Sequence, residues 1–173
     1  MNTSKSKKEL CVYISCQKGL EQYFPFFYQK VIYVLKHSKG WEQSGLSFSF
    51  TSTKKEGDLF IYLTTNEFIQ EECKFDEVVS CAHMDGSRRC YINLTRWLYG
   101  SEEAIGLSLS EYQIYVIGHE IGHVLGLEHE ICNLKETCLA PLMVPQTLST
   151  EGCLGNCWPL KYEIDKVKKI WNL

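Results

Sequence analysis

The sequence predicts an α+β (or α/β) fold, with one small mixed sheet, a central helix and a terminal helix. Three observations predict it. Short segments of alternating residues occupy much of the first two-thirds of the chain, and three longer segments carry apolar residues at helical spacing. Between the last two helical segments lies an irregular stretch that holds three of the four prolines. Because no repeat or linker interrupts the chain, we expect residues 1–173 to form a single domain, with residues 1–9 as a flexible tail.

Four segments are predicted to be strands. In Leu46–Thr51, Leu and Phe alternate with Ser, which is typical of a half-buried strand. The other segments also alternate, and they are rich in β-branched and aromatic residues. The expected strands cover residues 10–15, Leu46–Thr51, 58–64 and 90–94.

Helical spacing predicts one helix near the start of the chain and one at its end. In residues 26–36, Phe27 and Val31 recur on one side, Lys36 favours the negative end of the helix dipole, and Gly40 is the expected stop. Residues Lys161–Trp171 are amphipathic, which is typical of a surface helix that covers a core.

Composition excludes several classes of protein. The chain has 18 Lys and Arg against 21 Asp and Glu, a net charge of −3, so it lacks the basic surplus of a nucleic-acid binder. It contains no apolar run long enough for a membrane-spanning helix. Nine cysteines favour an oxidising compartment, although the polar, Lys-rich first residues do not form a secretory signal. The compartment is therefore left open, with a preference for an extracellular location.

The central segment, residues 107–125, is the most informative one. Ser110 is the expected N-cap, and Gln113 would complete a capping box. A buried stripe is expected at Ile114, Ile117, Ile121 and Val124.

Beside this stripe the sequence reads His119-Glu120-Ile121-Gly122-His123. Residues four apart lie on one face of a helix, about 6 Å apart along its axis, so two imidazoles can bind one metal ion. Glu120 lies one residue further round the helix, where its carboxylate can act on a water molecule without being a ligand. This is the H-E-x-x-H arrangement of zinc hydrolases.

The pattern continues beyond the helix. Gly126 follows His123 by three residues, and His129 follows Gly126 by three. Glycine permits a sharp turn with positive φ, which can bring His129 back to the same ion as a third ligand. Three protein ligands leave one position for water or substrate, which is the format of a catalytic zinc site. We therefore expect one Zn²⁺, with Glu120 as the general base.

At these residues the sequence resembles the metzincin metalloproteases, whose extended motif H-E-x-x-H-x-x-G-x-x-H is matched in full. That superfamily has a methionine-containing turn beneath the zinc, and the resemblance assigns this role to Met143. A closer resemblance is to a family of uncharacterised, mostly secreted bacterial metzincin-like proteins. It rests on KGW (39–41), YINL (91–94), RW (96–97), residues 118–129, APLM (140–143), QT (146–147), GC (152–153) and WP (158–159).

This resemblance implies a compact minimal metzincin fold, one zinc ion and proteolysis, but it supplies no substrate. In some metzincins a tyrosine follows the turn methionine by two residues and lies near the metal. Here that position is Pro145, so an additional tyrosine ligand is not expected.

Cys132 and Cys153 bracket the methionine turn, and we predict that they form a disulfide bond. A loop of about 20 residues closed in this way contributes on the order of 3 kcal/mol. Several alternatives stay open for the other cysteines. A second bridge is expected among Cys73, Cys81 and Cys90. Cys11 and Cys16 are either paired with each other or free. A second zinc site at Cys138, Cys153 and Cys157 is a weaker alternative.

The leading hypothesis is a zinc endopeptidase that acts on a peptide or protein substrate as a monomer, without nucleic acid or a membrane span. An extended substrate is expected to pair with an edge strand, either residues 58–64 or residues 90–94. Two alternatives are a zinc-stabilised binding domain without turnover and a zinc amidase acting on a non-protein substrate such as a cell-wall peptide. Glu120 argues against the first, because a structural zinc site needs no base.

Overall fold

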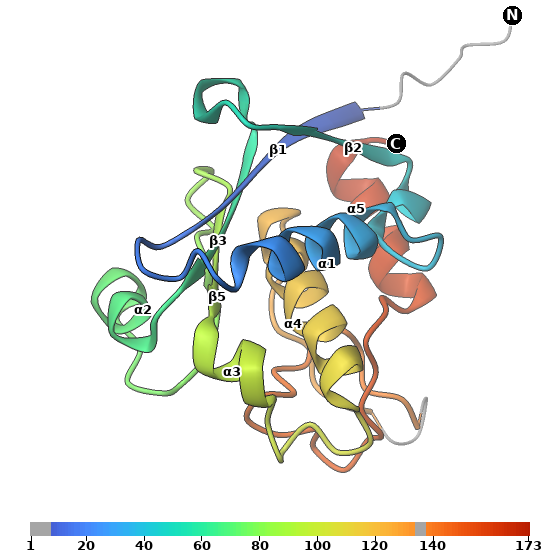
Figure 1. Ribbon diagram of the computed structural model, residues 1–173. Coiled ribbons are helices and arrows are strands. Elements are labelled where there is room, and N and C mark those ends of the chain that lie inside the picture. The colour runs from blue at the N-terminus through green and yellow to red at the C-terminus, as the bar shows by residue number, and fades with distance from the viewer. Residues whose placement is uncertain (1–7, 134–137) are drawn as a thin grey trace, which may run out of the picture.

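The computed structural model describes residues 8–133 and 138–173, which form a five-stranded sheet with helices packed around it (Figure 1). The described residues contain five α-helices, so the predicted α+β class is confirmed. The strands are β1 (Lys8–Cys16), β2 (Leu46–Thr51), β3 (Leu59–Thr64), β4 (Cys81–Ala82) and β5 (Arg89–Asn93). The helices are α1 (Phe24–Lys36), α2 (Asn66–Cys73), α3 (Leu94–Tyr99), α4 (Leu109–Val124) and α5 (Lys161–Trp171).

The strand order is β2-β1-β3-β5-β4, and only the β4–β5 pair is antiparallel. All four predicted strands form, within two residues of their expected bounds. β1 begins at Lys8, which pairs with Leu46, so Lys8 and Glu9 belong to the sheet. The rest of the predicted tail, residues 1–7, lies outside the described residues.

Helix α1 ends at its predicted last residue, but Gly40 is not its stop. Its last residue is Lys36, and His37 is already extended with ψ 139°. Gly40 instead precedes a short 3₁₀ turn at Trp41–Ser44. The expected stop at Gly40 is therefore wrong, and the chain leaves the helix three residues before it.

The cap of α4 also differs from the expected one. Ser108 is the N-cap, and its hydroxyl accepts from the Glu111 N–H while the Glu111 carboxylate accepts from the Ser108 N–H. Ser110 accepts a hydrogen bond from Lys30, and the buried Gln113 side chain donates to the Trp97 carbonyl. The predicted Ser110–Gln113 box is therefore wrong. An acidic partner at Glu111 suits the positive end of the helix better than an amide does.

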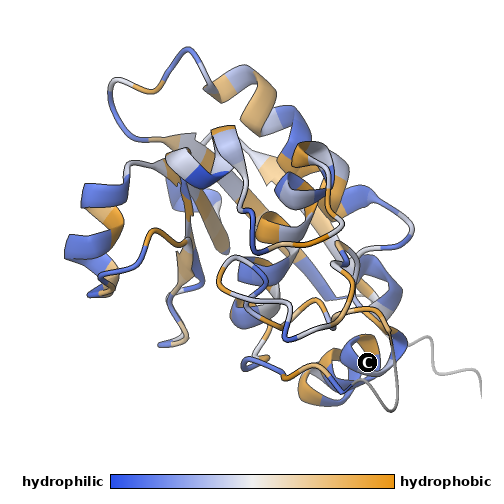
Figure 2. Ribbon diagram, turned by 90° about the horizontal axis from the view of Figure 1, so that it is seen from below, coloured by the Kyte–Doolittle hydropathy of each residue, from blue (hydrophilic) through white to orange (hydrophobic). Residues whose placement is uncertain are grey.

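The core lies between the sheet and helices α1 and α4, which lie on the same side of it (Figure 1). Hydrophobic residues gather along the strands and on the helices that face them (Figure 2). The predicted stripe on α4 is buried, with exposed fractions of 7% or less at Ile114, Ile117 and Ile121 and 9% at Val124. The opposite face of the sheet carries half-buried aromatic side chains, among them Tyr13, Phe60 and Tyr62.

Two disulfide bonds join described residues. Cys132 pairs with Cys153, as predicted, and Cys73 pairs with Cys81. Since Cys153 is bonded to Cys132, it is not available to the alternative second zinc site. The remaining five cysteines are free thiols, namely Cys11, Cys16, Cys90, Cys138 and Cys157. Two disulfides fit an extracellular location.

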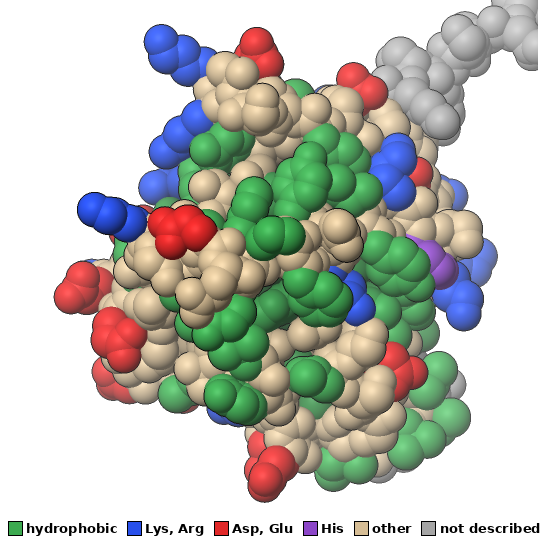
Figure 3. Space-filling view, in the orientation of Figure 1, with side chains coloured by type: hydrophobic (Ala, Val, Ile, Leu, Met, Phe, Trp, Pro, Cys, Tyr) green, Lys and Arg blue, Asp and Glu red, His purple; other side chains and the backbone are tan. Residues whose placement is uncertain are grey.

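The described helices are all too short or too polar to cross a membrane. Hydrophobic side chains nevertheless reach the surface over α1 (Figure 3). On this helix, Phe26 is 55% exposed and Tyr33 is 47% exposed.

Candidate metal centre

Helix α4 places His119 and His123 on one face, one helical turn apart. Their Nε2 atoms lie 3.2 Å from each other. Each ring is held from its other side, because His119 Nδ1 lies 2.8 Å from the Leu142 carbonyl oxygen and His123 Nδ1 lies 2.8 Å from the Leu127 carbonyl oxygen.

These contacts fix the protonation of both rings. A carbonyl oxygen can only accept, so each Nδ1 carries the proton and each Nε2 presents a lone pair. Two lone pairs that face each other at 3.2 Å repel unless a cation lies between them. Histidine ligands of metals ordinarily donate their second N–H to a carbonyl or carboxylate in this way. The donor set therefore fits a metal ion.

A tight turn at Gly126 brings the third histidine to the same point. Gly126 has φ 101°, a conformation that favours glycine, and its N–H bonds to the His123 carbonyl. The ring of His129 then lies 5.3 Å from that of His119 and 4.7 Å from that of His123, measured between centroids. One nitrogen from each of the three histidines lies within 4.8 Å of the others, so this group can bind a metal ion.

Burial keeps all three rings neutral at neutral pH. It lowers the pKa of His119 well below its usual value and the pKa of His123 to about 4. Partial desolvation also lowers the pKa of His129, the most exposed of the three rings. Neutral imidazole is the form that binds metals, so protons compete weakly for this site.

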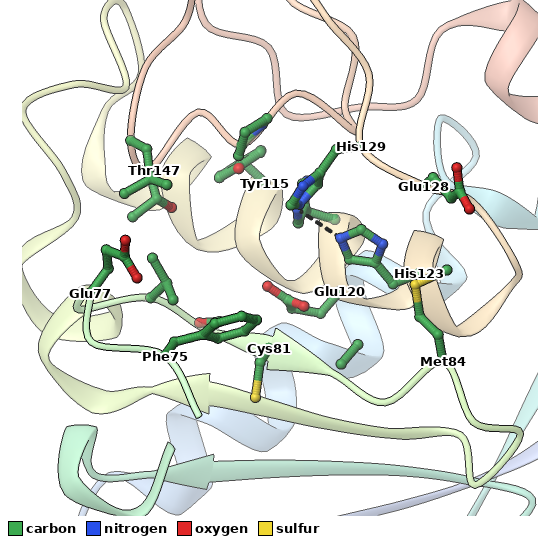
Figure 4. A pocket seen from close by; sticks show the side chains of 16 residues that line it. Phe75, Glu77, Cys81, Met84, Tyr115, Glu120, His123, Glu128, His129 and Thr147 are labelled. Carbon is green, nitrogen blue, oxygen red and sulfur yellow. Dashed lines mark hydrogen bonds between the residues drawn. The ribbon is translucent and has the colours of Figure 1, made fainter. Parts of the chain in front are cut away.

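Glu120 is buried beside the three rings, and its carboxylate points into the same pocket (Figure 4). Burial raises the pKa of Glu120 to about 8. Among the described residues, no donor forms a hydrogen bond with this carboxylate. A cation bound by the histidines would favour the charged carboxylate and lower that pKa again.

Met143 packs against α4 at Gly122, the residue before His123, and is 0% exposed. A Cβ built on Gly122 of α4 would stand 2.3 Å from the Met143 Sδ, so the helix and the turn meet where only glycine leaves room. The turn also contacts both ends of the motif. Its Leu142 carbonyl accepts from His119, and its Met143 carbonyl accepts from the Glu130 N–H at 3.0 Å.

The pocket in front of the histidines has a volume of about 600 Å³, and most of its walls are apolar. One wall is β4 with the segment before it, residues 75–80, and the other is the segment at Pro145, Thr147 and Leu148 (Figure 4). The acidic side chains of Glu77 and Glu128 lie at opposite sides of this pocket, and no Lys or Arg lines it within the described part of the chain.

The strand beside the pocket is not one of the two that the sequence suggested. β3 lies between β1 and β5, and β5 lies between β3 and β4, so neither has a free edge. β4 is the edge strand next to the site. It has only two residues, Cys81 and Ala82, and its pairing with β5 rather than its sequence defines it.

Each wall of the pocket is closed by a disulfide. Cys73–Cys81 closes the segment that carries Phe75, Glu77 and Val79, with 6.7 Å between its Cα atoms. Cys132–Cys153 closes the segment that carries Met143, with 6.1 Å between its Cα atoms.

Sequence reasoning missed one residue of the centre. The side chain of Glu163, at the start of α5, is completely buried and bonds to the Leu142 and Met143 N–H groups. The only sequence signal was a carboxylate in the first turn of an amphipathic helix, which reads as an ordinary cap.

The sequence model of one family matches residues 2–164, and its description is protein of unknown function (DUF3152). The chain belongs to the DUF3152 family. No curated protein matches it. Since membership in the DUF3152 family carries no assigned activity, the function has to be argued from the three histidines and the groups around them.

Proposed function

We propose that the chain is a zinc-dependent endopeptidase of the metzincin type. One observation carries the proposal: the imidazole nitrogens of His119, His123 and His129 converge at a pocket that also holds the buried Glu120 carboxylate. Three histidine ligands with one open position are the format of a catalytic zinc site rather than a structural one. The extended motif and the methionine turn, both typical of metzincins, support the same assignment.

The ion held by the three histidines would supply Lewis-acid activation of a water molecule and of the scissile carbonyl. Glu120 accepts the proton of the attacking water at its carboxylate and later gives it to the leaving amine. The apolar walls around Glu120 exclude bulk water, which strengthens every electrostatic interaction in the pocket. His119 and His123 stay oriented because the carbonyls of Leu142 and Leu127 hold their Nδ1–H groups.

The shape of the pocket supports an extended peptide as substrate. β4 runs along one wall, and in the described part of the chain no strand pairs with its outer edge. Extended peptides commonly bind by adding a strand to such an edge, while pockets select their side chains. The two disulfides beside the site support action outside the cell, where such bonds persist.

Of the two alternative functions, only the binding domain differs from this proposal in the role of Glu120. A binding domain without turnover does not need a buried carboxylate that receives no hydrogen bond from the described residues, so Glu120 argues against it. A zinc amidase with a cell-wall substrate would use the same residues, because the chemistry of amide hydrolysis is shared. Only the choice of substrate separates the amidase from the endopeptidase.

The test is cleavage of a proteome-derived peptide library and of peptidoglycan by zinc-loaded protein. The decisive variant is Glu120→Gln, which keeps the size of the side chain but removes the base. Glu102→Gln is the matched control, because it makes the same change at an exposed residue outside the pocket. The proposal expects peptide cuts by the wild type and by Glu102→Gln, and none by Glu120→Gln at equal zinc content. Equal cutting by all three would refute the role of Glu120, and cutting of peptidoglycan alone would favour the amidase.

A further inference from the structure

Glu163 is a second buried acidic residue near the metal centre. It lies in the first turn of α5 and is 0% exposed. Three backbone N–H groups donate to it: Leu142 at 3.0 Å, Met143 at 2.9 Å and Leu160 at 2.7 Å. Within the described residues, no Lys or Arg forms an ion pair with it. Its charge is therefore compensated by backbone dipoles alone, and two of these belong to the methionine turn.

The same two residues connect Glu163 with the histidines. Leu142 gives its N–H to Glu163, and its carbonyl oxygen accepts from His119 Nδ1 at 2.8 Å. Met143 also gives its N–H to Glu163, and its carbonyl oxygen accepts from the N–H of Glu130, next to His129. The turn is thus held on one side by a carboxylate of α5 and holds two parts of the histidine motif on its other side.

We propose that Glu163 is a positioning residue of the metal centre. Glu163 binds the N–H groups of Leu142 and Met143 and thereby fixes the position of the Leu142 carbonyl. That carbonyl keeps the His119 proton on Nδ1, so the Nε2 of His119 faces the metal. This inference rests on the proposed function only in so far as the three histidines bind a metal ion. Groups that orient a metal ligand from behind typically change metal affinity by about 10–100-fold when they are removed.

A second helix of this chain provides the control. Glu111 holds the same capping position in α4, but among the described residues its carboxylate accepts only from the N–H and hydroxyl of its own cap residue, Ser108. Glu111→Gln therefore weakens a helix cap alone. Glu163→Gln weakens a cap and also turns an amide group toward N–H donors of the methionine turn. The difference between the two variants isolates the contact with the turn.

The experiment measures zinc affinity by competition with a chelator, the absorption spectrum of the Co²⁺-loaded protein, and the thermal unfolding of the metal-free protein. We expect Glu163→Gln to weaken zinc binding by about tenfold or more and to change the Co²⁺ spectrum. We expect Glu111→Gln to lower the unfolding temperature while its zinc affinity stays within about twofold of the wild type, because its contacts end at its own helix.

Two results would overturn the proposal. One is a Glu163→Gln protein that unfolds more easily but binds Zn²⁺ and Co²⁺ as the wild type does. The other is a wild type that binds no zinc at all, which would also refute the proposed function. A wild type that binds zinc but cleaves nothing would refute the peptidase alone, since metal affinity still reports the role of Glu163.

If Glu163→Gln does not fold, hydrogen exchange in the wild-type protein tests whether Glu163, the methionine turn and His119 are coupled. The proposal expects the Leu142 and Met143 amides and the Nδ1–H of His119 to become exposed in one common opening, with equal exchange protection. Protection of the Nδ1–H that is independent of the two amides would contradict it.

Discussion

Replacing Gly122 by alanine should destabilise the protein, although alanine is the better helix former. The new Cβ would stand 2.3 Å from the Sδ of Met143 and 3.1 Å from Cζ2 of Trp41, both of which are buried. Overpacking of this kind costs about 1–3 kcal/mol. The higher helix propensity of alanine offsets about 1 kcal/mol of this cost in unfolding free energy.

Gly118→Ala is the matched comparison on the same helix. The three atoms nearest to its Cβ would all belong to the Leu142 side chain, with Cδ2 the closest at 3.2 Å, so a small shift of that side chain accommodates it. Since both variants gain the same propensity, Gly122→Ala should be less stable than Gly118→Ala by about 1–3 kcal/mol. Urea unfolding of the metal-free proteins measures the difference.

A double variant shows whether Met143 is the cause. In a Met143→Ala background the 2.3 Å contact is gone, so Gly122→Ala should become neutral or stabilise by up to about 1 kcal/mol. The change of sign is the signature of a direct contact in a double-mutant cycle. If Gly122→Ala costs the same with and without Met143, the packing of the methionine turn against α4 is not as described.

Three further predictions follow from the site. Replacing both Cys132 and Cys153 by serine should cost about 3 kcal/mol of unfolding free energy in the chain-entropy model, measured by urea unfolding, and an unchanged stability would show that the bridge does not form. Since burial lowers the pKa of His123 to about 4, proton competition should release zinc only as the pH falls well below the ordinary histidine pKa, and loss of zinc near about pH 6.5 in a metal-content titration would contradict this. Peptides with Lys or Arg beside the cleaved bond should be preferred, because the carboxylates of Glu77 and Glu128 attract positive charge. The double variant Glu77→Gln/Glu128→Gln should lower kcat/KM for these peptides by about 2–5-fold at low salt, since the charges are partly screened by solvent. The kcat/KM for neutral peptides should stay unchanged. An equal loss for neutral peptides would exclude that electrostatic role.

The regular elements follow from local patterns, which is why the sequence was enough for them. Leu46–Thr51 alternates Leu and Phe with Ser, and the structure forms a strand over the same residues. Lys161–Trp171 has one apolar side and forms a helix over the same residues. The common position of His119 and His123 could also be predicted from the sequence, because residues four apart lie on the same face of any α-helix.

What the sequence could not supply depends on contacts between distant segments. β4 has two residues and exists only because β5 lies beside it, so it has no periodicity to detect. Helix α2 is short and its residues are mostly polar, so a pattern of apolar spacing hardly marks it. Glu163 looks like an ordinary cap until the methionine turn, about 20 residues earlier in the chain, is seen to bond to it.

The prediction of the α4 cap was wrong for a different reason. Ser108 precedes α4 and Ser110 lies in its first turn, and each is followed three residues later by a residue that can complete a box. The choice between Glu111 and Gln113 is decided by the helix dipole, which favours the negative side chain in the first turn.

X-ray absorption at the zinc edge of the zinc-loaded protein, with the metal content determined in parallel, identifies the ligands of the metal. We predict one zinc per chain, bound by three imidazole nitrogens at about 2.0–2.1 Å and by one light atom from solvent. In His129→Ala, one imidazole should disappear from the spectrum. Sulfur at about 2.3 Å from the zinc, or wild-type protein that retains no zinc, would contradict the three-histidine centre and the peptidase built on it.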